Sequence, residues 1–405
     1  MKMLFQLAWR NIWRHPARSG VLLAAVTAGL WAGVVTVGTM NGMLNQRVDY
    51  LIESEITHVQ IHHPEYRTER RPGDYIPHSE AIKTWLNDHE MVKSWSPRVL
   101  AEGMLQSPVK SSGVRIRGLN TESENRTTTF HENLADGEYL PDSLRNPVMI
   151  GEAMAEEHNL QIGNRVVLTF EDISGDLTSA AFNISGLFRS ASADYDRMTV
   201  LVKDSDFIPL LGDDNITHEI AVLLYDADNA RVMADALNER FEGIEARTWT
   251  EVSPELSTII QLGGLMLYIV TIVIMAALAF GILNTMLMAL FERMREIGML
   301  MSIGMSRFRI FMMIVFEAVM LTLAGAGAGL LLAGLSVGYL SERGINFSQF
   351  AEGIAEIGWD PIVYPVLTTN EYLVILTVVI VITLAAALYP AIKAIRINPL
   401  EAGRA

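Results

Sequence analysis

Four long apolar runs dominate the pattern of hydrophobic and polar positions along the chain. They cover residues 19–41, 257–291, 310–340 and 371–392. Each reaches the roughly 20 apolar residues that a helix needs to cross a bilayer. Backbone polar groups find no partner in lipid, so a spanning segment has to be helical. We therefore expect an α-helical membrane protein with four transmembrane helices.

The second run is longer than a bilayer requires. About 34 helical residues that rise ~1.5 Å each cover ~50 Å, against ~30 Å of hydrocarbon. Tilting absorbs only part of this difference. We expect the surplus of the segment 257–291 to continue beyond the membrane as a stalk.

The segment 42–256 has the mixed pattern of a folded domain. Residues 57–62 alternate in polarity as a half-buried strand does, and residues 152–159 and 227–241 have a helical pattern. Apolar, β-branched runs at 165–170 and 198–202 are typical of buried strands. The prediction is a large extracytoplasmic α+β domain inserted between helices 1 and 2, with two subdomains whose boundary stays open.

Basic residues predict the orientation of the four spans. They gather in the segments 1–18, 292–309 and 393–405, whereas the loop 341–370 has Arg343 as its single basic residue. The positive-inside rule then puts both termini and the central loop in the cytoplasm of a bacterial inner-membrane protein. The α+β domain is expected in the periplasm.

The first residues, 1–18, have the pattern of an amphipathic helix on the inner membrane surface. Tryptophan and arginine side chains occur together there, as is typical of interfacial helices. The run 19–41 could also be the core of a signal peptide. Its ~22 apolar residues exceed the 7–15 of such a core, so we expect an anchor that is not cleaved.

Composition excludes several classes of function. The chain has 405 residues, 50% of them hydrophobic, a net charge of −15 and no cysteine. Thiol chemistry and thiolate metal sites are therefore excluded. Residues 42–256 carry most of the acidity, and nucleic-acid binding needs clustered positive charge instead. A membrane partner is expected and a nucleic acid is not.

The central loop is the candidate functional segment. A charged, glycine-punctuated helix between two membrane spans is a place where a cytoplasmic partner can push on the membrane. The alternative is an ordinary charged loop whose arginines only set the topology. The candidate partner contacts are Glu292, Arg293, Arg295, Glu296, Gly298, Gly304, Ser306 and Arg307.

Several motifs resemble the ABC-transporter permeases of the MacB/FtsX/LolC–LolE superfamily, the four-span type VII permeases. The likeness covers nearly the whole chain, with one span before a large outer domain and three spans after it. The similar segments are 7–16, 292–298 with 304–307, Glu317 with the glycines of the third span, and 389–391 with 397–402.

This resemblance implies a non-catalytic permease that works by mechanotransmission. The chain contains no Gly-Lys-Ser or Gly-Lys-Thr, so it has no phosphate-binding P-loop. A separate, dimeric ATPase subunit is expected to use ATP and Mg²⁺, with a second permease copy in a homodimer or a LolC/LolE-like heterodimer. No catalytic, cofactor-binding or metal-binding residue is assigned. His58 and His62 share a strand face, but we interpret them as surface histidines.

Met40-Asn41-Gly42-Met43 and Thr57–Ile61 resemble the lipoprotein-releasing LolC/LolE branch. The substrate implied is a lipoprotein or another hydrophobic molecule, with a periplasmic adaptor or chaperone as a further partner. A lateral cavity for acyl chains is one interpretation of the nearby apolar residues, and lipid contact or dimer packing is the other. These residues are Met40, Met43, Ile259, Leu262 and Met266.

Glycines at four-residue spacing allow helices to approach closely. We expect them to pack helices within one chain or to form a dimer seam. They are Gly29, Gly33, Gly325, Gly329, Gly334 and Gly338. Glu317 is an ionisable group inside a span, where such groups are costly. We expect it to be paired with an arginine or a helix end, or to be functional.

The function that these observations favour is lipoprotein release at the periplasmic side of the inner membrane. Two alternatives remain. One is tripartite efflux of a drug or peptide. The other is FtsX-like signalling across the membrane to a periplasmic cell-wall hydrolase.

Overall fold

The computed structural model describes residues 16–190, 192–350 and 361–396. Residues 1–15 of the predicted amphipathic helix, 1–18, and most of the tail, 393–405, lie outside these residues. Residues 16–18 are described and belong to the first long helix, which the sequence pattern expected to begin at residue 19. The chain divides into two compact units. The first comprises Met1–Gln46, Ile260–Gln349 and Ile362–Ala405, and the second comprises Arg47–Ile259 and Phe350–Pro361.

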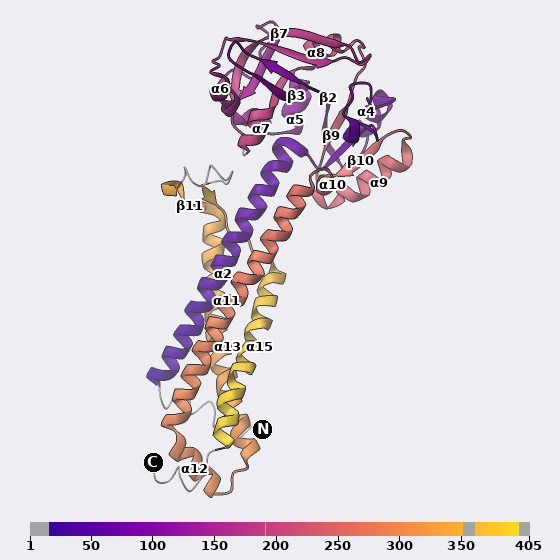
Figure 1. Cartoon of the computed structure of the whole chain (residues 1–405). Coiled ribbons are helices and arrows are strands. Elements are labelled where there is room, and N and C mark those ends of the chain that lie inside the picture. The colour runs from indigo at the N-terminus through magenta and orange to yellow at the C-terminus, as the bar shows by residue number, and fades with distance from the viewer. Residues whose placement is uncertain (1–15, 191, 351–360, 397–405) are drawn as a thin grey trace. The chain divides into compact units, whose positions relative to one another are not determined.

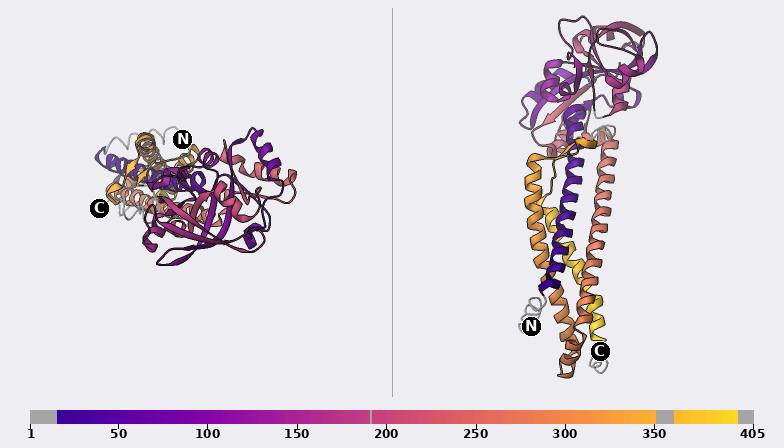
Figure 2. Two further views of the ribbon diagram at one scale, coloured as in Figure 1. Left: turned by 90° about the horizontal axis from the view of Figure 1, so that it is seen from above. Right: turned by 90° about the vertical axis from the view of Figure 1, so that its left-hand side faces the viewer.

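The first unit is a bundle of long helices. Figures 1 and 2 show these helices running alongside one another in two views at right angles. In the described part of the chain, four helices are long and apolar enough to cross a membrane. They are α2 (Pro16–Leu51), α11 (Pro254–Glu292), α13 (Arg307–Arg343) and α15 (Thr369–Ile395). The short helix α12 (Met294–Ser302) connects α11 to α13.

Three of these helices are much longer than the ~30 Å of bilayer hydrocarbon. With 36, 39 and 37 residues, α2, α11 and α13 are ~54, ~58 and ~56 Å long at a rise of ~1.5 Å per residue. The sequence pattern predicts this for α11. It places the end of the first span at residue 41, whereas α2 continues for ten more residues to Leu51. Polar side chains in that extension end the apolar run but do not interrupt helical hydrogen bonding.

Helix α2 packs on α13 through small residues. A Cβ at Gly329 would lie 2.9 Å from the carbonyl oxygen of Thr27, and one at Gly325 would lie 3.0 Å from Cβ of Val26. The Thr27 hydroxyl donates a hydrogen bond to the Gly325 carbonyl over 3.1 Å. This pair of glycines therefore holds two helices of one chain together.

The other glycines differ in their surroundings. A Cβ at Gly33 would meet Ile274 of α11 at 2.9 Å, and one at Gly29 would meet Leu278 at 3.6 Å. Gly334 and Gly338 have no neighbouring heavy atom within 4 Å of a built Cβ. Of the six glycines that the sequence pattern proposes for packing, Gly334 and Gly338 are thus the two that no described atom approaches.

A short connection between α13 and α15 packs on α2. It contains β11 (Ile345–Asn346), η4 (Ser348–Phe350) and β12 (Ile362–Val363). A Cβ at Gly42 would lie 2.1 Å from the carbonyl oxygen of Tyr364, so glycine is needed for this approach. The Asn41 amide donates to Glu371 over 2.6 Å, and Glu371 also forms the capping box that begins α15. Asn41 and Gly42 thus serve packing in this structure.

The second unit is an α+β domain built on one ten-stranded sheet. Its strands are β1 (Val59–His62), β2 (Val92–Gln106), β3 (Ser111–Leu119), β4 (Leu134–Gly137), β5 (Pro147–Gly151), β6 (Arg165–Glu171), β7 (Leu177–Phe188), β8 (Thr199–Lys203), β9 (Glu219–Leu224) and β10 (Glu245–Thr248). Strands β2, β3, β8, β5, β7 and β6 pair in a closed ring, because β6 pairs with both β7 and β2.

A smaller sheet continues from the first half of β2, in the order β10-β1-β9-β2. Its covering helices are α4 (Ser79–Asn87) and α9 (Ala230–Arg240). The small sheet and the ring each have their own hydrophobic core. The small sheet and the ring, which we call the two subdomains, share β2. No single boundary in the sequence separates them.

Short helices and turns connect the strands of this unit. They are η1 (Ile52–Ile56), α3 (Tyr66–Glu69), α5 (Thr121–Thr127), η2 (Phe130–Asn133), α6 (Glu152–His158), α7 (Ala193–Met198), α8 (Asp204–Leu211), η3 (Ala227–Asn229) and α10 (Trp249–Val252). The strands and helices expected from the patterns at 57–62, 152–159, 165–170, 198–202 and 227–241 are all among the observed elements.

Candidate functional site

The hairpin between α11 and α13 is built from a helix break, a short helix and a glycine turn. Helix α11 ends at Glu292, and Arg293 precedes α12. Helix α12 ends in a Schellman motif, because the amides of Gly304 and Met305 donate to the carbonyls of Met301 and Leu300 over 3.1 and 3.0 Å. Gly304 has a φ of +96°, which favours glycine. This turn directs the chain back into α13.

Helix α12 turns one face to the bundle and the other away from it. Ile297 and Gly298 are buried, and Ile297 belongs to the core of the bundle. Arg295, Met299 and Ile303 follow one another at four-residue spacing, which places them on one helix face. Met299 is 59% exposed and Ile303 is 84% exposed.

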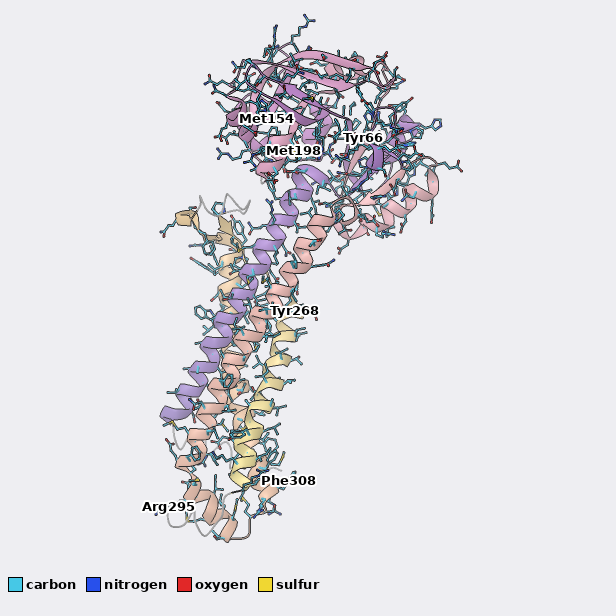
Figure 3. All side chains as sticks on the ribbon, viewed as in Figure 1. Tyr66, Met154, Met198, Tyr268, Arg295 and Phe308 are labelled. Atoms are coloured by element: carbon cyan, nitrogen blue, oxygen red, sulfur yellow. The ribbon has the colours of Figure 1, made fainter. Side chains whose placement is uncertain are left out.

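The start of α13 adds to this exposed surface. Phe308 is 71% exposed, and Arg307 and Arg309 are exposed beside it. Figure 3 shows Arg295 and Phe308 at the same end of the helical bundle. Exposed apolar side chains among arginines are typical of a protein-docking surface. We call Arg295, Met299, Ile303, Arg307 and Phe308 the hairpin surface.

Arg293 points into the bundle instead. Its Nη1 donates to both carboxylate oxygens of Glu317 over 3.2 and 3.1 Å, and its Nε donates to Glu296 over 3.2 Å. The Arg293 and Glu317 side chains are only 12% and 8% exposed. Arg293 therefore binds α12 to α13. Its burial does not suit the partner contact that the sequence motif suggests, because its donors are directed at Glu317 and Glu296.

The remaining candidate residues of the loop are also either exposed or buried in the bundle. Glu292, Ser306 and Gly304 are exposed with Arg295 and Arg307, whereas Gly298 is buried. Ser306 precedes α13 without a side-chain cap, so its hydroxyl is not used at the helix start. The residues that sequence reasoning missed are Met299, Ile303 and Phe308. Their helical spacing resembles that of core positions, so periodicity alone gave no signal.

A groove of about 390 Å³ lies between α2 and α11 in the bundle. Its lining is almost wholly apolar and rich in small residues: Ala25, Val26, Gly29, Ala32, Gly33, Thr36, Ile274, Ala277, Leu278, Gly281 and Ile282. None of the five predicted cavity residues lines it. Leu262 and Met266 are more than half exposed on α11, and Met40 and Met43 are half-buried. The Ile259 side chain lies outside the described part of the structure.

The interpretation of His58 and His62 as surface histidines is wrong for His62, which lies in β1 and is buried, whereas His58 precedes β1 and is half-buried. Both have structural partners. His62 Nε2 lies 3.0 Å from a Glu219 carboxylate oxygen, and His58 Nδ1 accepts a hydrogen bond from the Leu224 amide over 3.0 Å. Among the described residues, no group of three or more histidine, cysteine or acidic side chains could hold a metal ion.

Two family models match the chain in adjacent parts. The MacB-like periplasmic core domain matches residues 19–240, more than half of the chain. The FtsX-like permease C-terminal domain matches residues 268–399, which include the hairpin, α13 and α15.

Similar proteins cover nearly the full length. The lipoprotein-releasing system transmembrane protein LolC of Neisseria meningitidis serogroup B is 22% identical over 404 residues, 95% of this chain and 93% of the relative. The corresponding LolE of Haemophilus influenzae is 20% identical over 429 residues, 99% of each chain. Among solved structures, the periplasmic region of MacB from Actinobacillus actinomycetemcomitans is 14% identical and has a TM-score of 0.37. That match covers 52% of this chain and 98% of that one.

The matched segments correspond to the parts of the molecule described above. The periplasmic core match includes the described part of α2 from residue 19 and most of the α+β domain, and the permease match includes the hairpin. With its four long apolar helices, the chain is a multi-pass membrane protein with a periplasmic domain. It belongs to the family of ABC-transporter permeases that combine a MacB-like periplasmic core domain with an FtsX-like permease region.

Proposed function

We propose that this chain is the non-catalytic membrane subunit of an ABC transporter that releases lipid-anchored proteins at the periplasmic face of the inner membrane. A separate ATPase subunit supplies the energy by hydrolysing ATP. The observation that carries the proposal is the hairpin surface, at the end of a bundle whose sequence is similar over its length to lipoprotein-releasing permeases.

The hairpin surface has the composition of a docking site for a cytoplasmic protein. Arginines at the hairpin favour a cytoplasmic location by the positive-inside rule. Ile303 and Phe308 offer apolar area that a partner can bury, and arginine is enriched among residues that contribute most to interface affinity. A partner with an apolar cleft and an acidic rim would match this surface. An ATPase dimer would bring one such cleft to each of two permease copies.

The ion pair of Arg293 with Glu317 supports mechanical coupling. It binds the hairpin to α13 directly behind the docking face. Force applied to the hairpin surface is then transferred to the helices and is not absorbed by a flexible loop. Helices α2 and α11 are longer than a bilayer requires, and they directly precede and follow the α+β domain in the chain, so we expect them to carry this force. In this mechanism the substrate does not need to cross the bilayer.

The docking part of the proposal is tested by reversing charge on the hairpin surface. We expect Arg295→Glu with Arg307→Glu to abolish co-purification of the ATPase from the native host, because both arginines are exposed and form no side-chain hydrogen bond or ion pair within the described residues. Arg165→Glu is the control, since Arg165 is an exposed arginine of the periplasmic domain. Equal ATPase recovery with both proteins would refute the docking surface.

The cargo is tested on the same material. A permease–ATPase complex purified in mild detergent should contain acylated protein, detected by mass spectrometry of intact proteins and fatty acids. Addition of ATP should release this protein from proteoliposomes. If the complex contains the ATPase with an adaptor or a cell-wall hydrolase and no acylated protein, lipoprotein release is refuted. The role of the hairpin surface in binding the ATPase would still stand.

A further inference from the structure

The two subdomains of the periplasmic domain meet at Arg98. In β2, this residue pairs with Glu219 of β9 in the small sheet and with Leu119 of β3 in the ring. It is thus the position at which the shared strand passes from one subdomain to the other. Its side chain is 0% exposed and is among the largest that are fully buried in the described chain.

The Arg98 guanidinium connects three separate elements. Nε and Nη2 donate to the two carboxylate oxygens of Glu124 in α5, over 3.1 and 2.6 Å. Nη1 donates to the Glu219 carboxylate in β9 over 2.5 Å. It also donates to the backbone carbonyl of Glu55 over 3.1 Å. Glu55 lies in η1, the turn that directly follows α2.

Further polar groups extend this arrangement into both subdomains. Glu219 also lies 3.0 Å from His62 of β1 and 3.8 Å from Arg117 of β3. Arg117 Nη1 in turn donates to the Tyr195 hydroxyl of α7 over 2.5 Å. Although burial alone would raise the pKa of Glu219, the Arg98 guanidinium holds that pKa well below its usual range. The carboxylate therefore stays charged inside the domain.

The end of α2 has an unusual local structure at the same place. Residues Ile52–Ile56 form a π-helical turn, a feature that is frequent at functional sites. The next residue, Thr57, is buried and has a φ of +63°, which is strained for a β-branched side chain. The Thr129 amide donates to the Glu53 carbonyl over 3.0 Å, so the segment that follows α5 also holds this turn. Such strain persists only where surrounding contacts impose it.

Stability alone does not account for a buried arginine with two carboxylates. Replacing a buried ion pair by apolar residues of similar volume often leaves the stability of a protein unchanged or increases it. What the charged group adds is direction, because a guanidinium holds several acceptors in one fixed fork. Here the three acceptor groups belong to η1, which directly continues α2, to β9 of the small sheet and to α5, which follows β3 of the ring.

We propose that Arg98 is the positioning residue that clamps the end of α2 to both periplasmic subdomains at once. Movement of the helix is then transmitted to the whole domain and is not absorbed in the connection from η1 to β1. This inference rests on the proposed mechanical coupling. The clamp itself, however, is a property of the permease alone and can be measured without the ATPase.

The absence of cysteine from the chain allows a direct test by spin labelling. One label is placed at Asp49 on α2, and the second at Val232 on α9 or at Leu177 on β7. All three positions are exposed. Distances are recorded by double electron–electron resonance on the full-length permease in nanodiscs. The permease that keeps Arg98 should give one narrow distance distribution for each pair of labels.

The test variant is Arg98→Lys, which keeps the charge but replaces the fork with a single ammonium group. We expect both distributions to become roughly twofold broader, since one ammonium cannot hold all three acceptors in a fixed geometry. Arg98→Met with Glu124→Gln is the second variant, used if the lysine variant does not fold. The control is Lys203→Met, which removes another buried cation, 8% exposed, whose partner Asp142 lies on the surface of the domain.

Broadening in the Arg98 variant with a narrow control supports the clamp. Unchanged widths in the Arg98 variant, broad distributions in the wild type, or equal broadening in the control would each overturn it. Failure of the proposed function has a different signature, because the ATPase would then not associate with the permease while the distances stayed narrow.

Discussion

Removal of the Glu317 carboxylate is the most direct test of how the hairpin is held. Glu317→Ala deletes both acceptors of Arg293 Nη1 and leaves a side chain that is only 12% exposed with Glu296 as its remaining partner. Breaking a buried ion pair by removing one partner costs about 3–5 kcal/mol. Because Arg293 keeps Glu296, we expect a loss near the lower end, about 3 kcal/mol.

A double-mutant cycle separates the pair from its surroundings. Glu317→Leu, Arg293→Met and the combined variant Arg293→Met/Glu317→Leu are compared with the wild type, beside Glu317→Ala. The combined variant should recover most of the stability, since an apolar replacement of a buried pair is often neutral. The assay is thermal unfolding of the purified permease in detergent, followed by loss of the monodisperse peak on size-exclusion chromatography.

The reasoning fails on either of two results. If Glu317→Ala unfolds at the wild-type temperature, the ion pair does not hold the hairpin. If the combined variant is no more stable than the single variants, the cost arises from lost packing and not from an unpaired buried charge. Glu317→Gln keeps one acceptor oxygen, so its unfolding temperature should lie between those of Glu317→Ala and the wild type.

Three further predictions concern packing and pH. Gly329→Val should cost about 1–3 kcal/mol, because its Cβ would lie 2.9 Å from a backbone oxygen of α2, whereas Gly334→Val should leave the unfolding temperature unchanged. Gly151→Ala should destabilise the ring, since its Cβ would lie 2.1 Å from a backbone oxygen of α7 and that helix would have to move. The measurement is limited proteolysis, in which the variant should be cleaved faster than the wild type. Burial lowers the pKa of His218 to about 4, so only the unfolded chain takes up this proton between pH 6.5 and about 4. Stability should therefore fall by roughly 3 kcal/mol across that window as the pH decreases, and a His218→Gln variant should show a smaller fall in unfolding temperature.

Candidate site residues were only partly predictable from the sequence. The arginines and glycines of the hairpin are recognisable because a charged segment between two apolar runs is a local feature of the chain. Gly304 has a positive φ at a helix end, as its neighbours in the sequence suggest. The inward direction of Arg293 was not predictable, because its partner Glu317 is 24 residues away and on another helix.

The sequence by itself determined the four apolar helices, the unusual length of α11 and the charged hairpin. These features depend on composition and on contacts between neighbours in the chain, which a linear pattern records. Only the tertiary structure decided where the subdomains meet and what Arg98 does. The ring closes when β6 pairs with both β7 and β2, and the small sheet forms when β9 and β10 return to β1. Apart from that of β6 with β7, these pairings join residues more than 60 positions apart in the sequence. A hydrophobic pattern carries no information about which distant strands pair.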